Sequence, residues 1–356
     1  MKKEMMCLLA LLNFTFLYAE GDSKVLTLKS PSCNHEVIFR QVQMDAAVRE
    51  LRYAVNYNGA SILLDSRAGL QLDNRVWEKA LGVRDLKQPE CWMDNLEVDS
   101  VAYFPLVDNT WHPVYGERST VRDHYRSATL FMSKKDGSDY RLNVEVRAYD
   151  GGIAFRYFFP EHPKAIFHKV TGDLTNYRFP QGTMAWAEEW AQAPFSRVSI
   201  KELSKPVERA LTLELPNGIW VALADADVDD WCLTRFQTLP EEENTLMSVM
   251  YSPVDMVTYY ATPWKVIMAA DKPGKLLENN DIIQNLNPPS RIADEKEWVK
   301  PGKIIREMTM TTEGAFRSID FCAEHHIPYM LFDWKWYMPC TSHDGDATQV
   351  VDAIDM

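Results

Sequence analysis

The sequence predicts a mainly β protein that ends in the start of a parallel α/β domain. Short alternating runs of apolar residues, separated by turn-forming pairs such as Asn58-Gly59, extend from Val25 to about Val266 and are typical of antiparallel strands. After residue 300 the pattern changes to that of a helix followed by an apolar strand. The first pattern predicts a large antiparallel β-sandwich. The second predicts a β-α-β unit of the kind that begins a (β/α)8 barrel.

The strands of the predicted sandwich follow from this alternation. Four runs place apolar side chains on one face of an extended segment: residues 52–57, 129–132, 140–147 and 153–159. Asn58-Gly59 and Asn217-Gly218 are the pairs that a two-residue hairpin prefers, because both central positions need a positive φ. The abundant Trp and Tyr side chains fit a sandwich core better than a sugar-stacking surface, because large aromatics are the main filler of such cores.

Residues 285–300 are predicted to be a linker, because Pro288-Pro289 cannot continue a central strand and a charged run follows. Residues 314–326 then predict a helix that Thr311-Thr312 can cap. Its expected buried stripe consists of Ala315, Phe316, Ile319, Phe321, Cys322 and Ala323. With an apolar strand at 327–332, the predicted domains are a sandwich at 20–284, the linker, and an incomplete barrel fragment at 301–356.

Residues 1–19 predict a signal peptide. Lys2 and Lys3 precede an apolar run, and Tyr18-Ala19 offers a cleavage point before Glu20. The run is too short and too often interrupted by polar residues for a membrane span. We therefore expect a periplasmic or secreted protein that has no membrane span.

Charge and cysteine content restrict the partners further. The net charge of −13 and the pI near 5.1 argue against nucleic acid, which proteins bind by placing Lys and Arg against phosphates. Of the six cysteines, Cys7 lies in the predicted signal peptide, and the others lack any C-x-x-C spacing. We therefore expect buried thiols, with neither a disulfide framework nor a zinc cluster.

Six segments, in order along the chain, carry a family resemblance: AWAEEWAQ at 185–192, LTLELPNG at 211–218, TPWKVI at 262–267, NLNPP at 285–289, WVKPG at 298–302 and FDWKWY at 332–337. As a series they resemble glycoside hydrolase family 97 over essentially the whole mature chain. The resemblance implies an N-terminal β-super-sandwich, a catalytic (β/α)8 barrel and a small C-terminal β domain. It implies cleavage of α-glucosides or α-galactosides of oligosaccharides, with help from a bound calcium ion.

The catalytic residues are expected beyond Met356. Glycoside hydrolysis needs two carboxyl groups that flank the scissile bond, and barrel enzymes carry them at the C-terminal ends of strands. A barrel needs about 250 residues, whereas only 56 follow Lys300. The resemblance places the catalytic acid, and the nucleophile or base, on later strands, so we expect a truncated chain that is inactive alone. Asp344 and Asp346 are interpreted as loop charges.

Glu189 is the candidate metal ligand. In the family, the stretch that resembles residues 185–192 reaches the barrel's site, where a Glu helps to hold calcium. Matching Trp186 and Ala191-Gln192 puts Glu189 at that position, whereas Trp190 stands where the family tends to have a small residue. Calcium takes six to eight oxygen ligands, so one Glu makes no site by itself. The alternative is that Glu189 is a solvated loop acid.

Asp333 and Trp336 are the candidate substrate contacts. Asp333 follows the predicted strand at its C-terminal end, where barrel enzymes collect functional groups. Trp336 could offer a flat apolar face to a sugar ring. Both match the family stretch, whereas Trp334 and Lys335 depart from it. The alternative is that Asp333 only orders its loop through hydrogen bonds.

Two function classes follow. The first is an exported family 97 glycosidase, represented by a truncated or split gene product. The second is a non-catalytic carbohydrate-binding or scaffold module. A downstream reading frame that encodes the remaining barrel strands would favour the first. The sequence is compatible with gluco or galacto specificity and with retention or inversion of configuration.

Overall fold

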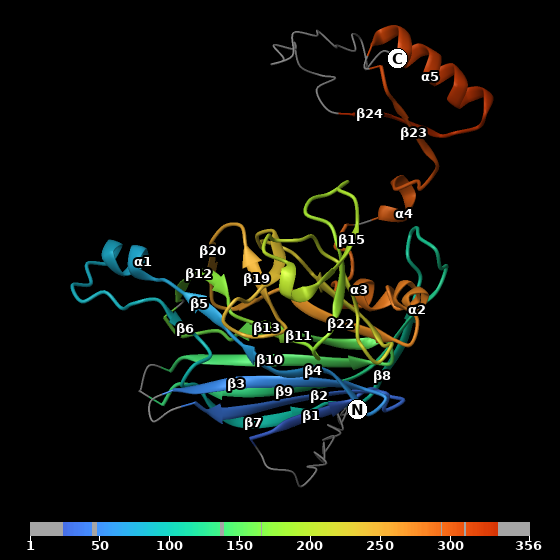
Figure 1. Ribbon diagram of the computed structural model, residues 1–356. Coiled ribbons are helices and arrows are strands. Elements are labelled where there is room, and N and C mark those ends of the chain that lie inside the picture. Colours follow the sequence, from blue (N-terminus) through green and yellow to red (C-terminus); the bar gives the residue numbers. More distant parts are fainter. Residues whose placement is uncertain are drawn as a thin grey trace, which may run out of the picture. The chain divides into compact units, whose positions relative to one another are not determined.

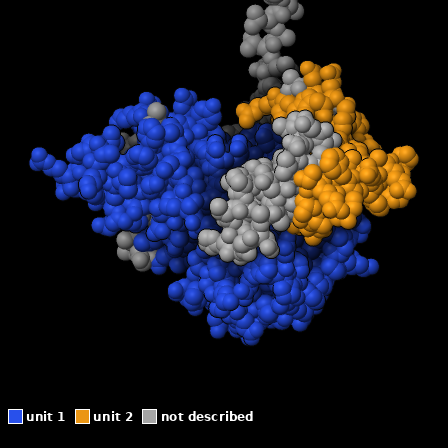
Figure 2. All heavy atoms as spheres, turned by 90° about the horizontal axis from the view of Figure 1, so that it is seen from above, with its two compact units in different colours: residues 1–111, 122–288 blue, residues 112–121, 289–356 orange. Residues whose placement is uncertain are grey.

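A computed structural model describes residues 24–44, 48–135, 139–164, 166–292, 294–309 and 311–333 (Figure 1). The chain divides into two compact units, one of residues 1–111 and 122–288 and one of residues 112–121 and 289–356 (Figure 2). The predicted signal peptide and Trp336 lie outside the described residues. Within the described ranges, no helix is both long and apolar enough to cross a membrane.

The first unit contains the predicted antiparallel sandwich (Figure 1). A four-stranded sheet has the order β1-β2-β3-β4, at Leu26–Lys29, His35–Gln43, Arg49–Tyr57 and Ala60–Ala68. An 11-stranded sheet follows the path β15-β14-β16-β17-β22-β11-β10-β9-β7, with β21 paired to β11 and β8 paired to β9. Its strands are β7 Glu97–Tyr103, β8 Val107–Trp111, β9 Val121–Ser133, β10 Arg141–Tyr149, β11 Gly152–Phe159, β14 Met184–Ala187, β15 Ser196–Ser199, β16 Leu211–Glu214, β17 Trp220–Ala226, β21 Tyr260–Ala261 and β22 Trp264–Ala270.

Two smaller sheets and several short helices complete this unit. The sheet β20-β12-β5-β6 uses Val254–Val257, Phe167–Asp173, Leu70–Leu72 and Glu90–Cys91, and the sheet β13-β19-β18 uses Asn176–Arg178, Thr245–Met250 and Thr234–Thr238. The helices are α1 Arg75–Ala80, the 3-10 turn Ile200–Glu202, α2 Pro273–Glu278 and α3 Asp281–Leu286. The predicted linker at 285–300 is partly helical, because α3 ends inside it and α4 occupies Glu295–Trp298.

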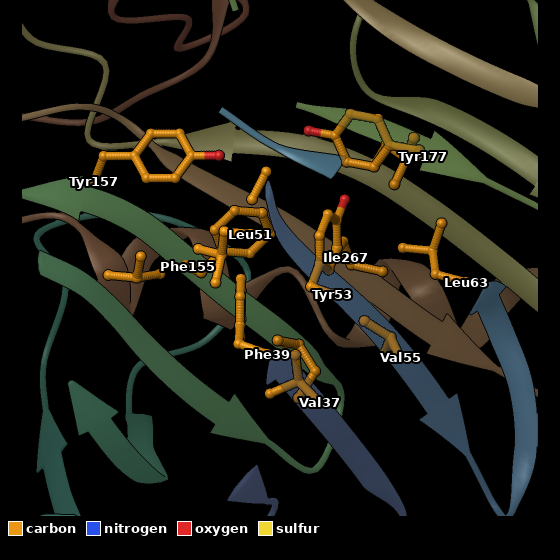
Figure 3. Packing of buried hydrophobic residues seen from close by; sticks show 14 of the residues in the cluster. Val37, Phe39, Leu51, Tyr53, Val55, Leu63, Phe155, Tyr157, Tyr177 and Ile267 are labelled. Carbon is orange, nitrogen blue, oxygen red and sulfur yellow. The ribbon is translucent and has the colours of Figure 1, made fainter. Parts of the chain in front are cut away.

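Aromatic side chains fill the core between the sheets, as predicted (Figure 3). Phe39 stacks on Tyr53 with ring centroids 5.4 Å apart, and Phe155 meets the edge of Phe39 at 5.3 Å. Each of these rings is at most 1% exposed. Such contacts add about 0.5–1.5 kcal/mol per pair beyond the burial of apolar area.

Strand β22 is buried on both faces. Ile267 and Ala269 belong to the main core, whereas Trp264, Val266 and Met268 belong to a second apolar cluster. The helical residues Leu276, Ile282 and Leu286 are part of that second cluster. A strand covered on both faces has no solvent side, which is why residues 264–270 show a nearly continuous apolar run.

The two predicted Asn-Gly hairpins differ. Asn58 and Gly59 both have positive φ, at 49° and 78°, and join β3 to β4 in a two-residue turn. The prediction for Asn217-Gly218 is wrong, because only Gly218 has a positive φ, at 82°. The Gly218 N–H donates to the Leu215 carbonyl at 2.9 Å, so Pro216 and Asn217 are the central residues of that turn. Pro216 fixes its own φ near −65°, which favours a type I turn followed by a left-handed Gly.

The second unit contains the predicted β-α-β element. Strand β23 at Ile304–Glu307 pairs in parallel with β24 at Tyr329–Phe332, and α5 at Thr312–Glu324 connects them. The Thr311 hydroxyl accepts a hydrogen bond from the Gly314 N–H at 3.1 Å, so the predicted cap is present.

The predicted buried stripe of α5 is only partly correct. Ala315 and Cys322 are buried, and Ile319 is half-buried. Phe316 is 52% exposed and Phe321 is 47% exposed, and Ala323 is exposed as well. The helix packs against the two strands β23 and β24, which cover only one side of it within the described residues.

The cysteine prediction also holds only in part. Among the described residues, Cys91 and Cys322 are buried free thiols, whereas Cys33 is exposed and Cys232 is half-buried. Cys33 has a φ of 64° in the turn between β1 and β2, and a turn at a sheet edge leaves its side chain in solvent.

Candidate functional site

Glu189 lies on the loop that joins β14 to β15 at the edge of the large sheet. Its carboxylate is 3.1 Å from the Lys205 Nζ, and both side chains are more than half exposed. Exposed ion pairs contribute only about 0–1 kcal/mol. A stronger partner can therefore displace Lys205 from Glu189 at little cost.

Arg235 on β18 fixes the main chain of this loop. Its Nη1 donates to the Glu189 carbonyl at 3.2 Å and to the Tyr251 hydroxyl at 2.8 Å. Its Nη2 donates to the Glu208 carboxylate, and the Glu208 N–H donates to the Glu188 carbonyl at 3.0 Å. The loop is thus tied to a second sheet, so the exposed Glu189 carboxylate projects from an anchored backbone.

A pocket of about 400 Å³ opens beside Glu189. Its lining consists of Ala187, Glu189, Trp190, Ala193, Pro194, Ser196, Val198, Glu202, Leu203, Ser204, Lys205 and Val207. Ala187, Leu203 and Val207 are buried apolar residues, whereas Trp190 is 55% exposed. The volume falls in the range of about 300–1,000 Å³ that small-molecule pockets occupy.

The described residues do not form a complete calcium site. Within the described ranges, no group of three or more His, Cys, Asp and Glu side chains is placed to hold a metal ion. Calcium needs six to eight oxygen ligands, and Glu189 supplies a single carboxylate that is paired with Lys205. A calcium site that includes Glu189 therefore needs further oxygen ligands besides this one carboxylate.

Asp333 directly follows β24 in the second unit and forms an ion pair with Arg306 of β23, with 2.5 Å between Oδ2 and Nη2. Along both strands, exposed residues alternate with less exposed ones. Glu307, on the covered face, accepts hydrogen bonds from Thr309 near the start of α5. Arg306 is exposed and lies on the opposite face of β23 from Glu307, away from α5. Because Asp333 directly follows β24, the ion pair lies near the C-terminal ends of the two strands.

Trp336 lies outside the described residues, and Glu189 and Asp333 belong to different units. Sequence reasoning missed Lys205, Arg235 and Arg306. Each lies on another element, at least 16 residues from the residue that it contacts. No local motif could have indicated these partners, because pairing between distant segments depends on the tertiary fold.

Comparisons with known proteins place the chain in a family. A retaining alpha-galactosidase from Bacteroides thetaiotaomicron is 24% identical over 410 aligned positions, which cover 100% of this chain and 56% of that protein. A probable retaining alpha-galactosidase from Streptomyces bingchenggensis is 21% identical, with coverage of 97% and 51%. The chain therefore spans about half the length of these curated relatives.

Solved structures show the same fold. A glycoside hydrolase family 97 enzyme from Pseudoalteromonas sp. strain K8, in complex with acarbose, superimposes with a TM-score of 0.75 at 19% identity, over 89% of this chain and 48% of that one. A beta-arabinopyranosidase superimposes with a TM-score of 0.67 at 17% identity, over 86% and 50%. Residues 28–289 match the glycosyl-hydrolase 97 N-terminal domain. This match covers well over half of the chain, which therefore belongs to the glycoside hydrolase 97 family.

Proposed function

We propose that the protein is an exported glycosidase acting on α-galactosides or α-glucosides of oligosaccharides, and that the sandwich supports a catalytic barrel which begins at β23. The match of residues 28–289 to the family carries this proposal. Two curated relatives are named as retaining alpha-galactosidases, which favours α-galactosides and retention. The proposal of export rests on the signal-peptide pattern of residues 1–19. We expect the exported protein to begin at Glu20, and its intact mass tests this expectation.

Within the barrel, we assign Asp333 to substrate contact. Arg306 holds its carboxylate at the strand ends, where it can accept hydrogen bonds from sugar hydroxyls. Trp336 is proposed to stack against the same sugar. The catalytic acid and its partner carboxylate are proposed to lie in the part of the relatives that this chain does not span.

The experiment is a comparison of two proteins with aryl α-galactoside and aryl α-glucoside in the presence of calcium. We expect the 356-residue chain to show no turnover, because both members of the carboxyl pair that hydrolysis needs are proposed to lie in the part of the relatives that this chain does not span. A fusion of this chain to the remaining barrel of the Bacteroides thetaiotaomicron relative is expected to restore hydrolysis. Turnover of roughly 1 per second or more by the chain alone would contradict the placement of the catalytic residues.

Glu189 is proposed as one ligand of a calcium ion. In the fusion protein, Glu189→Gln should weaken calcium binding about tenfold or more and lower activity in parallel, because a hard cation loses an anionic ligand. Calcium affinity is measured by calorimetry. The matched control is Glu202→Gln, which changes another acid of the same pocket. Equal calcium affinities of Glu189→Gln and wild type would remove this assignment.

The second candidate function is a non-catalytic carbohydrate-binding module. The observation that favours it is the pocket beside Trp190, which residues of the first unit alone form. Sugar binding by the chain, without hydrolysis by the fusion protein, is the result that would select this function over the first.

A further inference from the structure

The chain passes between its two compact units at three points, after residues 111, 121 and 288. The first two points flank residues 112–121, which join β8 to β9 but belong to the second unit. Asn285, near the end of α3, lies shortly before the third point and hydrogen-bonds the first-unit residues that border the other two. We propose that Asn285 is a clamp that couples the β8–β9 hairpin to α3 and the start of the linker.

Both polar groups of the Asn285 side chain take part in the clamp. The Trp111 Nε1 of β8 donates to Asn285 Oδ1 at 2.8 Å. Asn285 Nδ2 donates to the Arg122 carbonyl of β9 at 2.9 Å. An amide carries both an acceptor and a donor, whereas a carboxylate of the same shape offers acceptors only. The residue type therefore suits a bridge between an indole N–H and a main-chain carbonyl.

The main chain of Asn285 is held as well. Arg147 Nη1 donates to the Asn285 carbonyl at 3.4 Å. This carbonyl is one of the last of α3, which have no partner within the helix. The Arg147 guanidinium lies over the rings of Tyr125 and Trp264, 4.6 and 4.9 Å from their centroids, and such contacts restrict its position. The clamp thus includes side chains of β9, β10 and β22.

Helix α3 itself is anchored in the first unit. Ile282 and Leu286 are 5% and 3% exposed and belong to the second apolar cluster, so the Asn285 side chain projects from a fixed helix. Asn287 behaves differently, because its Nδ2 donates to the Ile283 carbonyl at 2.6 Å, within the same segment. Among the described residues, no hydrogen bond joins Asn287 to β8 or β9.

The clamp predicts that two remote segments open together. Trp111 and Asn285 are 174 residues apart in sequence, yet an opening of either segment breaks the bond that the other one needs. Such coupling is equal in both directions. One net hydrogen bond changes a local opening equilibrium roughly threefold to tenfold. The inference does not depend on the proposed function.

The test is hydrogen exchange of the 356-residue chain, followed by mass spectrometry of its peptides. Asn285→Ala should speed exchange in β8 roughly threefold to tenfold, and Trp111→Phe should do the same in α3. Each effect is measured on the element that does not carry the change, so the higher helix propensity of Ala within α3 does not contribute. In both variants, trypsin should also cut faster after Arg118, within 112–121, and after Arg291, in the linker.

Two further variants separate the clamp from a general loosening of the linker. Asn285→Asp keeps the shape of the side chain but loses the donor to Arg122, so exchange in β8 should still rise. The matched control is Asn287→Ala, which should leave β8 unchanged because its hydrogen bond stays within its own segment.

Circular dichroism and thermal melting establish that each variant is folded. Unchanged exchange of β8 in both Asn285 variants overturns the inference, as does unchanged exchange of α3 in Trp111→Phe. Equal acceleration of β8 by Asn287→Ala overturns it as well. No measurement involves hydrolysis, so failure of the clamp and failure of the proposed function can be told apart.

Discussion

At the scale of single residues, two buried histidines stand out. His168 is 1% exposed, and its ring contacts the rings of Trp92 and Phe159 at centroid distances of 4.7 and 5.5 Å. Burial, with smaller contributions from Lys134 and His162, lowers the pKa of His168 to about 4. Burial likewise lowers the pKa of His35 to about 4, although the nearby Asp150 opposes the shift. Both imidazoles are therefore neutral in the folded protein at pH 7.

These histidines predict an acid-sensitive fold. The folded-state pKa near 4 lies below the ordinary value of 6.5, so the unfolded chain binds more protons between these pH values. The contribution of each neutral histidine to the free energy of unfolding is fully present above about pH 6.5. It is lost as the pH falls toward 4, by on the order of 3 kcal/mol for each histidine. In urea unfolding at pH 4.5 and 7, His168→Gln should reduce this loss. The exposed His112→Gln serves as control, and an undiminished loss in His168→Gln would contradict the prediction.

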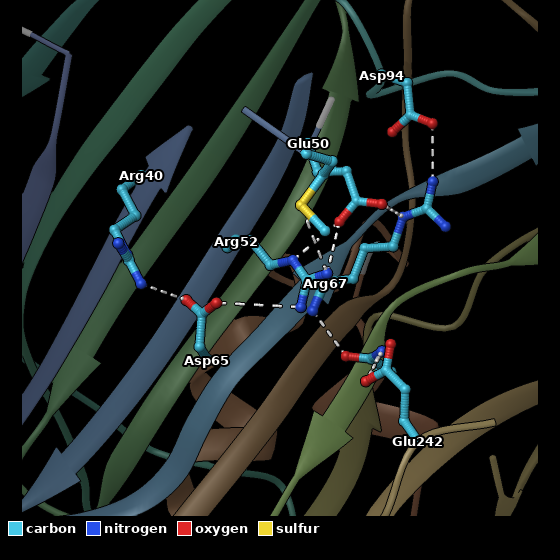
Figure 4. A network of polar contacts seen from close by, with 9 residues as sticks. Arg40, Glu50, Arg52, Asp65, Arg67, Asp94 and Glu242 are labelled. Atoms are coloured by element: carbon cyan, nitrogen blue, oxygen red, sulfur yellow. Dashed lines mark hydrogen bonds and ion pairs between the residues drawn. The ribbon is translucent and has the colours of Figure 1, made fainter. Parts of the chain in front are cut away.

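At the scale of elements, the strands β2, β3 and β4 show how register decides charge pairing (Figure 4). Arg40 lies directly opposite Arg52, and Arg52 lies directly opposite Arg67. Like charges in such positions destabilise a sheet. Each of these arginines forms an ion pair with a carboxylate, which offsets the repulsion. Asp65 is 2.9 Å from Arg40, Glu50 is 2.7 Å from Arg52, and Asp94 is 2.8 Å from Arg67.

The turn at Asn58-Gly59 joins β3 to β4. The different backbone conformations of Gly59, in this turn, and Gly274, in a helix, predict opposite effects of a Gly→Ala substitution on stability. Gly59→Ala should destabilise the protein by about 1 kcal/mol, because its φ of 78° is a left-handed conformation that a Cβ disfavours. Gly274→Ala, within helix α2, should stabilise it by about 0.5–1 kcal/mol. A Cβ at either position would meet nothing within 4 Å. Chemical denaturation of both variants measures the difference, and effects of equal sign would refute the argument from backbone conformation.

At the scale of the whole molecule, a buried ion pair connects two sheets of the first unit. Lys265 of β22 contacts Asp173 of β12, and their side chains are 10% and 2% exposed. Asp173 also accepts a hydrogen bond from the Thr175 N–H at 3.1 Å. Removing one partner of such a pair leaves an uncompensated buried charge, whereas neutralising both partners costs far less.

The buried pair gives a prediction for global stability. Lys265→Met should lower the free energy of unfolding by about 3–5 kcal/mol, because Asp173 then lacks its cation. Adding Asp173→Asn should recover much of this loss, since Asn retains the acceptor for Thr175 without a charge. Urea unfolding of the wild type, the two single variants and the double variant forms a mutant cycle. Additive effects of the two substitutions would show that the pair is not coupled.

The sequence alone determined the local features of this protein. Period-two alternation predicted the strands, Asn58-Gly59 predicted a hairpin, and Thr311 predicted the start of α5, because each depends on residues within a few positions. The order of six short motifs indicated the family. Glu189 and Asp333 were selected from that resemblance, and their roles remain predictions.

Only the tertiary structure decided which distant segments meet. It placed β22 between β17 and β11, it paired Glu189 with Lys205, and it left Phe316 exposed although the helical pattern predicted burial. It also formed the pocket beside Trp190 from residues on both sides of β15. The physical reason is that periodicity defines which face of an element is apolar, whereas the partner that covers this face comes from remote parts of the chain.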